Sequence, residues 1–155
     1  MEMINTFIQA PDMARIKIKL PDTFSFVANI PVRITDINYG GHVGNDTILS
    51  IIHEARMQFL HHHGYTEMNM AGAGLIMSDA AIEFKSELFY GESVAVAIAV
   101  ADITKVSFEL YYRMEKNRNG KNLLVAVAKT GMLCYDYEKK KIIHLPSEVR
   151  AALTS

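Results

Sequence analysis

Residues 32–45 read VRITDINYGGHVGN, and this stretch decides the fold. It begins in an extended segment that runs from Phe24 to Thr35. Three glycines between Gly40 and Gly44 then require a tightly bent loop. Apolar residues recur at helical spacing immediately afterwards. The stretch therefore predicts a strand, a glycine-rich loop and a helix, in that order.

The predicted helix is apolar around more than one stripe. One face holds four apolar residues and a second side holds two more: Ile48, Ile52, Ala55 and Phe59, then Leu49 and Leu60. A helix of this kind is wrapped by its surroundings. Asn45 or Asp46 is expected to cap its first turn, and Gly64 to end it.

The rest of the chain predicts strands. Arg15–Leu20 alternates between polar and apolar residues, as a half-exposed strand does. Further strands are expected over residues 82–90, 94–101, 105–116 and 122–137, with an Asn119-Gly120 hairpin and a terminal helix over residues 146–153. One helix cannot cover both faces of such a sheet, so we expect a partner subunit to cover the remainder.

Composition excludes several classes of protein. The 155 residues suit a single domain over residues 15–155, after an N-terminal arm over residues 1–14. The net charge of −1 favours neither nucleic acid nor an anionic membrane as a partner. No apolar stretch approaches the roughly 20 residues that span a bilayer. Cys134 is the single cysteine, which indicates a reduced, cytoplasmic setting and a buried, unreactive thiol.

This order of elements, with these residues, resembles the hotdog-fold acyl-CoA thioesterases, in particular the 4-hydroxybenzoyl-CoA thioesterase-like branch. Residues 32–45, followed by His53-Glu54-Ala55-Arg56, are similar to the family's strand, Asp-x-Asp, glycine, His-Val-Asn-Asn, helix and Glu-Ala-Arg pattern. Weaker similarities lie at residues 90–94 and 145–146. The resemblance spans roughly residues 27 to 153.

The resemblance implies an α+β hotdog fold, in which a curved antiparallel sheet wraps one long helix. It also implies a homodimer or a dimer of dimers, with sheets paired edge to edge and acyl-CoA at the subunit interface. The implied reaction is hydrolysis of an acyl-CoA or acyl carrier protein thioester. It needs no cofactor or metal beyond the coenzyme A of the substrate.

One departure from the family bears on the chemistry. The second acid of Asp-x-Asp attacks the thioester or activates water in this branch, and Asn38 stands at that position here. An amide is neither a nucleophile nor a base. The chemistry has therefore moved to another residue or been lost.

Several loop residues have both a functional and a structural interpretation. The backbone N–H groups of Gly44 and Asn45 could polarise a thioester carbonyl or simply begin a helix. Asn38 could hold a water, or be present for its preference for turns. Asp36 could act as a base through water, or pair with Arg33.

Two further residues are candidates. His42 could donate to the thioester or hydrogen-bond the loop. Glu54 could be the base, because loss of solvent on a wrapped helix would strengthen it, or it could form an ion pair. Glu54 is narrowly favoured over Asp36. The run of residues 61–63, three histidines about 100° apart on the helix, cannot chelate one metal ion.

Two rival functions remain open. Hotdog hydratases have Asp-x-Asn-Pro-x-His, and Asp36-Ile37-Asn38 fits its start. Tyr39 replaces the proline, however, and His42 lies one residue too far along. A non-catalytic acyl-CoA-binding protein is the other rival, and Asn38 favours it.

Overall fold

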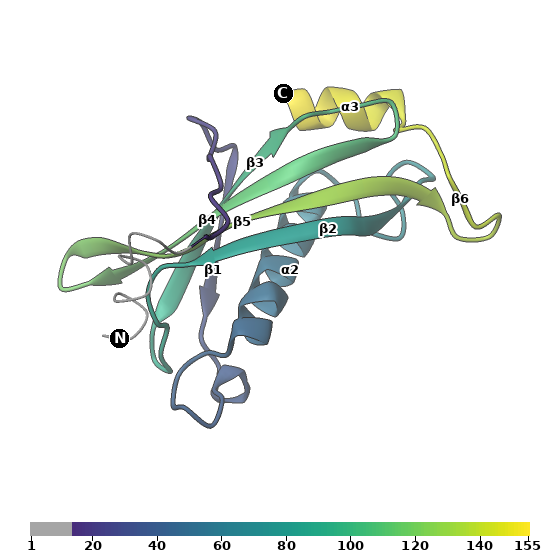
Figure 1. The fold of residues 1–155 in the computed structure, drawn as a ribbon. Coiled ribbons are helices and arrows are strands. Elements are labelled where there is room, and N and C mark those ends of the chain that lie inside the picture. Colours follow the sequence, from purple (N-terminus) through teal and green to yellow (C-terminus); the bar gives the residue numbers. More distant parts are fainter. Residues whose placement is uncertain (1–13) are drawn as a thin grey trace.

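A six-stranded antiparallel sheet curves around one long helix in the structure, a computed structural model that describes residues 14–155 (Figure 1). The strands are β1 (Phe26–Pro31), β2 (Gly74–Phe84), β3 (Ser93–Ala101), β4 (Ser107–Arg118), β5 (Lys121–Asp136) and β6 (Lys141–Ile142). The helices are η1 (Ile34–Asp36), α2 (Asn45–His62) and α3 (Ser147–Thr154). The strand order is β1-β3-β4-β5-β2, and β6 pairs with the end of β5. The predicted α+β hotdog architecture is confirmed.

The core lies between α2 and the sheet. Ile52, Ala55 and Phe59 of α2 are fully buried, as are Val96 and Ile98 of β3. Each large apolar side chain buried in this way contributes about 1.5–3 kcal/mol. The opposite side of α2 is exposed over much of its length. The sheet therefore wraps the helix on one side, and a single chain leaves the other side open.

The hairpin predicted at Asn119-Gly120 and the helix end predicted at Gly64 are both confirmed. Asn119 and Gly120 have φ angles of 54° and 80°, which are the left-handed values that a two-residue hairpin turn requires. They join Arg118 of β4 to Lys121 of β5 in direct register. Gly64, with φ of 82°, follows the last turn of α2 as predicted.

The strand predicted over Arg15–Leu20 is wrong. This segment forms no strand, and one hydrogen bond that holds it runs from the N–H of Ile18 to Oε2 of Glu83 at 2.7 Å. Alternation alone does not supply a neighbouring backbone with which to pair. Residues 1–13 of the predicted arm lie outside the described part of the chain.

The strand predicted over residues 82–90 is displaced. β2 runs from Gly74 to Phe84, and its pairing with β5 has an irregularity between Met77 and Asp79. The chain leaves the sheet after Phe84, and the carbonyl of Leu88 accepts the N–H of Val43 at 2.8 Å. The apolar residues beyond Phe84 therefore support the glycine loop instead of extending the strand.

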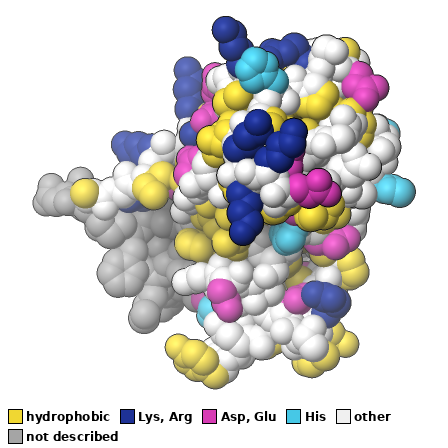
Figure 2. Space-filling view, turned by 90° about the vertical axis from the view of Figure 1, so that its right-hand side faces the viewer, with side chains coloured by type: hydrophobic (Ala, Val, Ile, Leu, Met, Phe, Trp, Pro, Cys, Tyr) yellow, Lys and Arg dark blue, Asp and Glu magenta, His cyan; other side chains and the backbone are white. Residues whose placement is uncertain are grey.

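Charge is dispersed on the surface. Figure 2 shows a face on which a few Lys and Arg side chains gather near the centre, among acidic, apolar and histidine side chains. Lys139 and Lys140 lie exposed in the β5–β6 turn, and Lys141 begins β6. Within residues 14–155, no helix is long and apolar enough to cross a membrane.

Candidate active site

The glycine loop is fixed by its own backbone. The N–H of Asn38 donates to the carbonyl of His42 at 2.9 Å, and the N–H of Gly41 donates to the carbonyl of Asn38 at 3.1 Å. Gly41 has a φ of 81°, which a residue with a side chain rarely adopts. The N–H of Val43 also donates to the carbonyl of Leu88. Together these hydrogen bonds fix the position of the first turn of α2.

Gly44 is the N-cap residue of α2, and no side chain caps this end of the helix. The predicted capping by Asn45 or Asp46 is therefore wrong. A Cβ at Gly44 would lie 2.7 Å from Oδ1 of Asp46, so glycine permits this close approach. The first N–H groups of a helix have no intrahelical acceptor. Without a cap, those of α2 remain available to an oxygen atom of a ligand.

Asn38 and His42 both make hydrogen bonds within the loop. Oδ1 of Asn38 accepts the N–H of Gly40 at 2.9 Å, which leaves its amide NH₂ without a protein partner among residues 14–155. Nδ1 of His42 lies 3.0 Å from the carbonyl oxygen of Val43. A carbonyl can only accept, so this contact places a proton on Nδ1 and leaves Nε2 as the acceptor of a neutral ring.

Asp36 is held by Arg33, as the sequence suggested. Its Oδ2 accepts the N–H of Arg33 at 2.8 Å, and its Oδ1 lies 3.3 Å from Nη2 of the same residue. The aspartate is 5% exposed, whereas the arginine side chain is mostly in solvent. Each carboxylate oxygen of Asp36 thus already accepts a hydrogen bond from Arg33.

A groove of about 420 Å³ lies between β1 and α2 and brings Asp36 and Glu54 together. Glu54 accepts a hydrogen bond from Nε2 of Gln58 at 2.9 Å. It lies exposed on the outer side of α2, so the burial expected to strengthen it as a base is absent in a single chain. The four other candidates lie outside the lining of this groove: Asn38, His42, Gly44 and Asn45.

A second cavity, of about 300 Å³, lies on the other flank of α2, beside β2. Its lining comes from the first two thirds of the helix and from one residue of β2: Asp46, Leu49, Ser50, His53, Arg56 and Met77. Ser50 and His53 line both hollows. The exposed stripe of α2 around His53 is therefore where the two hollows meet.

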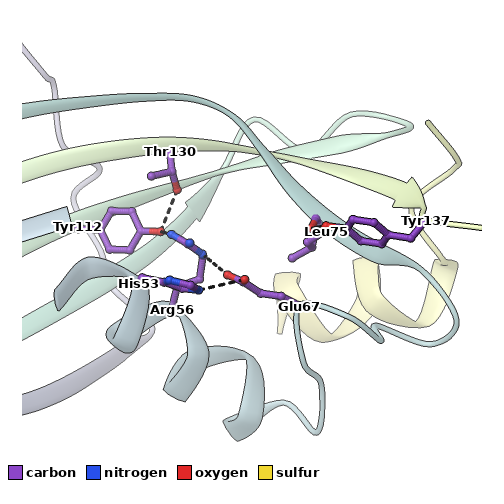
Figure 3. Close-up of polar contacts among 7 residues, drawn as sticks. All are labelled: His53, Arg56, Glu67, Leu75, Tyr112, Thr130 and Tyr137. Carbon is purple, nitrogen blue, oxygen red and sulfur yellow. Dashed lines mark hydrogen bonds and ion pairs between the residues drawn. The ribbon is translucent and has the colours of Figure 1, made fainter. Parts of the chain in front are cut away.

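The sequence interpretation gave no role to a polar network that starts beneath this stripe (Figure 3). Arg56 is 5% exposed, and its Nε lies 2.6 Å from Oε1 of Glu67. Its Nη1 donates to the hydroxyl of Tyr112 at 3.3 Å, and that hydroxyl lies 2.8 Å from Oγ1 of Thr130. Nε2 of His53 lies 3.1 Å from the other oxygen of Glu67. The network thus links the sheet, the helix and the following loop.

Burial and charge act on this network in opposite directions. Burial disfavours the charged form of Arg56, but Tyr112 and Glu67 outweigh it and hold the pKa of Arg56 above its ordinary value. Burial raises the pKa of Tyr112, so its hydroxyl stays neutral. Arg56 is consequently a permanent buried cation, and Glu67 is its counter-charge.

Within residues 14–155, no three His, Cys, Asp or Glu side chains gather in a way that could hold a metal ion. Cys134 is buried, and desolvation raises its pKa to about 11. The inert thiol expected from the sequence agrees with this environment.

Comparisons with known proteins agree with the fold. A family model described as "Thioesterase-like superfamily" matches residues 32–153. A protein of Aquifex aeolicus (strain VF5) named "Putative esterase" is 25% identical over 130 residues, which cover 83% of this chain and 97% of that protein.

Solved structures give the same picture. A 1,4-dihydroxy-2-naphthoyl-CoA thioesterase from Synechocystis has a TM-score of 0.75 at 21% identity, over 84% of this chain and 96% of that one. A 4-hydroxybenzoyl-CoA thioesterase with one aspartate replaced by asparagine, in complex with 4-hydroxybenzoyl-CoA, has a TM-score of 0.75 at 15% identity, over 83% and 97%. At these identities the likeness shows a shared fold.

Proposed function

We propose that this chain, which belongs to the thioesterase-like superfamily, hydrolyses an acyl thioester of coenzyme A or acyl carrier protein to a free acid and a thiol. The observation that supports this most is the uncapped start of α2. A buried glycine there leaves backbone N–H groups open, and Asp46 of the first turn lines the smaller hollow, which also contains His53.

In this proposal the N–H groups of Gly44 and Asn45 polarise the thioester carbonyl. Negative charge grows on that oxygen as water attacks, and a helix N-terminus stabilises it. The amide NH₂ of Asn38 and Nε2 of His42 are the polar groups of the adjoining loop that can orient the substrate or a water. No metal or cofactor takes part.

Of the two carboxylates, we assign contact with the attacking water to Glu54 ahead of Asp36. Both oxygens of Asp36 already accept hydrogen bonds from Arg33. Glu54 has one such partner, Gln58, and its exposed carboxylate can accept a hydrogen from water. The paired isosteric changes described in the Discussion separate the two.

Assembly completes the proposal. The outer side of α2 is open in one chain, and β1 and β2 are the outer strands of the main strand order. We place a second copy of the chain against this side, as a homodimer or a dimer of dimers. Light scattering at micromolar protein tests this, and a monomeric mass would contradict it.

The function is tested by the release of free thiol from a panel of acyl-CoAs, including hydroxyaryl-CoAs of the kind that the solved relatives bind or hydrolyse. Turnover above the no-enzyme rate with at least one substrate is the expected result. Absence of thiol release over the whole panel would refute hydrolysis.

A second candidate, a protein that binds acyl-CoA without cleaving it, is favoured by one observation: Asn38 stands where the family has its catalytic acid. The asparagine variant of 4-hydroxybenzoyl-CoA thioesterase holds its 4-hydroxybenzoyl-CoA. Calorimetric binding of acyl-CoA without thiol release would assign this second function.

A further inference from the structure

His53 lies on the exposed stripe of α2, at the junction of the two hollows. Its side chain is 54% exposed, and its Nε2 lies 3.1 Å from Oε2 of Glu67. Among residues 14–155, Nδ1 has no hydrogen-bond partner. One ring nitrogen is therefore fixed by a carboxylate while the other is open to solvent and to a ligand.

Glu67 is itself immobilised (Figure 3). Its Oε1 pairs with Nε of Arg56 at 2.6 Å, and the buried guanidinium cannot lose its charge. The Arg56 side chain is 6% exposed, and the Glu67 carboxylate is the counter-charge that lies against it. An ionised carboxylate only accepts, and its second oxygen faces Nε2 of His53. In the neutral ring, the proton thus lies on Nε2 and the lone pair on Nδ1.

We propose that His53, oriented by Glu67, is the general base that takes the proton from the water attacking the thioester. The inference rests on the proposed function and adds to it. His53 and Glu67 form the base and orienting carboxylate of a catalytic dyad. Glu54, which lines the same groove, holds the second hydrogen of that water.

The spacing along α2 permits this role. His53 comes eight residues after Asn45, which is about 12 Å along the helix axis. Helical side chains lean toward the N-terminus, so the imidazole covers several ångströms of that distance. Asp46 and His53 line one cavity, so the way between them is open.

Hydrolysis then proceeds through a tetrahedral intermediate. Nδ1 of His53 removes a proton from water as the water oxygen bonds to the carbonyl carbon, and the C=O electron pair moves to the carbonyl oxygen. That oxygen rests on the N–H groups at the start of α2. The tetrahedral intermediate re-forms C=O and breaks the C–S bond, and the proton on Nδ1 passes to the thiolate. The products are a carboxylic acid and a thiol, with His53 neutral again.

An imidazole suits this task better than a solvated carboxylate. A general base is most effective when its pKa lies near the working pH, and histidine is the residue type whose ordinary value is closest to neutrality. A carboxylate in water is a much weaker base at that pH. The chain can then hydrolyse a thioester although Asn38 stands at the family's catalytic position, because a base lies on the helix.

His53→Ala is tested against His61→Ala, which removes another exposed histidine from the same helix. Thiol release is measured for wild type and both variants with an acyl-CoA that wild type hydrolyses. Each assay is repeated with added imidazole, and the no-enzyme rate is subtracted. The expected result is a fall in kcat of about 100-fold or more for His53→Ala, with KM changed little. Imidazole should restore part of the lost rate in His53→Ala alone. His61→Ala should keep the wild-type rate.

A merely structural His53 would change the melting temperature without an effect that imidazole reverses. A kcat for His53→Ala equal to that of His61→Ala, or a loss that imidazole leaves unchanged, would overturn the role of His53 and leave the proposed hydrolysis standing. No thiol release by the wild-type protein would overturn the hydrolysis and the dyad together.

Discussion

Replacing Glu67 by glutamine should destabilise the protein through Arg56. The substitution keeps the size of the side chain and removes the negative charge that the buried guanidinium requires. Removing one partner of a fully buried ion pair costs about 3–5 kcal/mol. The Glu67 side chain is 22% exposed, and glutamine still offers one acceptor oxygen, so water and the amide offset part of that loss. We expect a decrease of about 2–3 kcal/mol in the free energy of unfolding.

Arg56→Met provides the matched comparison, because it removes the buried charge itself. Tyr112 then keeps its contact with Thr130, and Glu67 keeps His53. We expect this variant, and the double variant Arg56→Met with Glu67→Gln, to be more stable than Glu67→Gln alone. Urea unfolding followed by circular dichroism measures all three, and Glu67→Gln should also melt about 5–10 °C below wild type. A Glu67→Gln variant within about 0.5 kcal/mol of wild type would refute the reasoning, since that is the range of ordinary surface substitutions.

Three further outcomes are expected. Asn38→Asp should raise thioester hydrolysis by up to about 10²- to 10⁴-fold by restoring a carboxylate, and an unchanged rate with an intact circular dichroism spectrum would show that water is not activated from this position. Glu54→Gln should lower turnover with acyl-CoA binding kept, whereas Asp36→Asn should have a weaker effect; normal turnover by Glu54→Gln would contradict its assignment. Cys134, whose pKa is raised to about 11 by burial, should react with a thiol reagent at pH 8 far more slowly in the folded than in the urea-unfolded protein, and equal rates would contradict its burial.

The elements predicted correctly are those whose cause is local in sequence. The helix α2 follows from the spacing of its apolar residues, and the β4–β5 hairpin from Asn119-Gly120, whose left-handed conformations allow only a few residue types. Gly41 and Gly64 marked the loop and the helix end for the same reason. In the turns the conformational preference of one or two residues determines the backbone, and in the helix the spacing of the apolar residues does.

The errors lie where a partner distant in sequence decides. Arg15–Leu20 alternates well but forms no strand, and Ile18 bonds instead to the carboxylate of Glu83, 65 residues further along. β2 ends at Phe84 because Leu88 is taken by the glycine loop. The capping prediction failed for a local reason, because the neighbouring Gly44 holds the N-cap position and Asn45 lies in the first turn. Periodicity does not report these competing contacts.

The candidate site shows the same difference between contacts that are local in sequence and contacts that are distant. The sequence placed Asp36 beside Arg33 correctly, because three residues separate them. It gave no account of His53 or Glu67, which lie 14 residues apart and meet only because the chain turns back after α2. The available signal was Arg56, a charged residue immediately after Ala55 on the side of the helix that faces the core. A cation there predicts an acid supplied from outside the helix, although it does not identify which one.

The buried arginine connects stability with the proposed chemistry. Burying Arg56 is unfavourable unless an anion accompanies it, so the fold must bring Glu67 to a fixed place at the edge of the core. A carboxylate fixed in this way has a second oxygen directed toward the surface, where His53 contacts it at 3.1 Å. With methionine in place of the arginine, the Glu67 carboxylate would lose the ion pair that fixes it, and it would orient the imidazole less firmly. Arg56→Met should therefore lower the kcat of the folded protein, even though Arg56 contacts no reacting atom. The decrease in kcat should exceed what its change in the free energy of unfolding would predict. A variant with wild-type kcat would show that Glu67 can orient His53 without it.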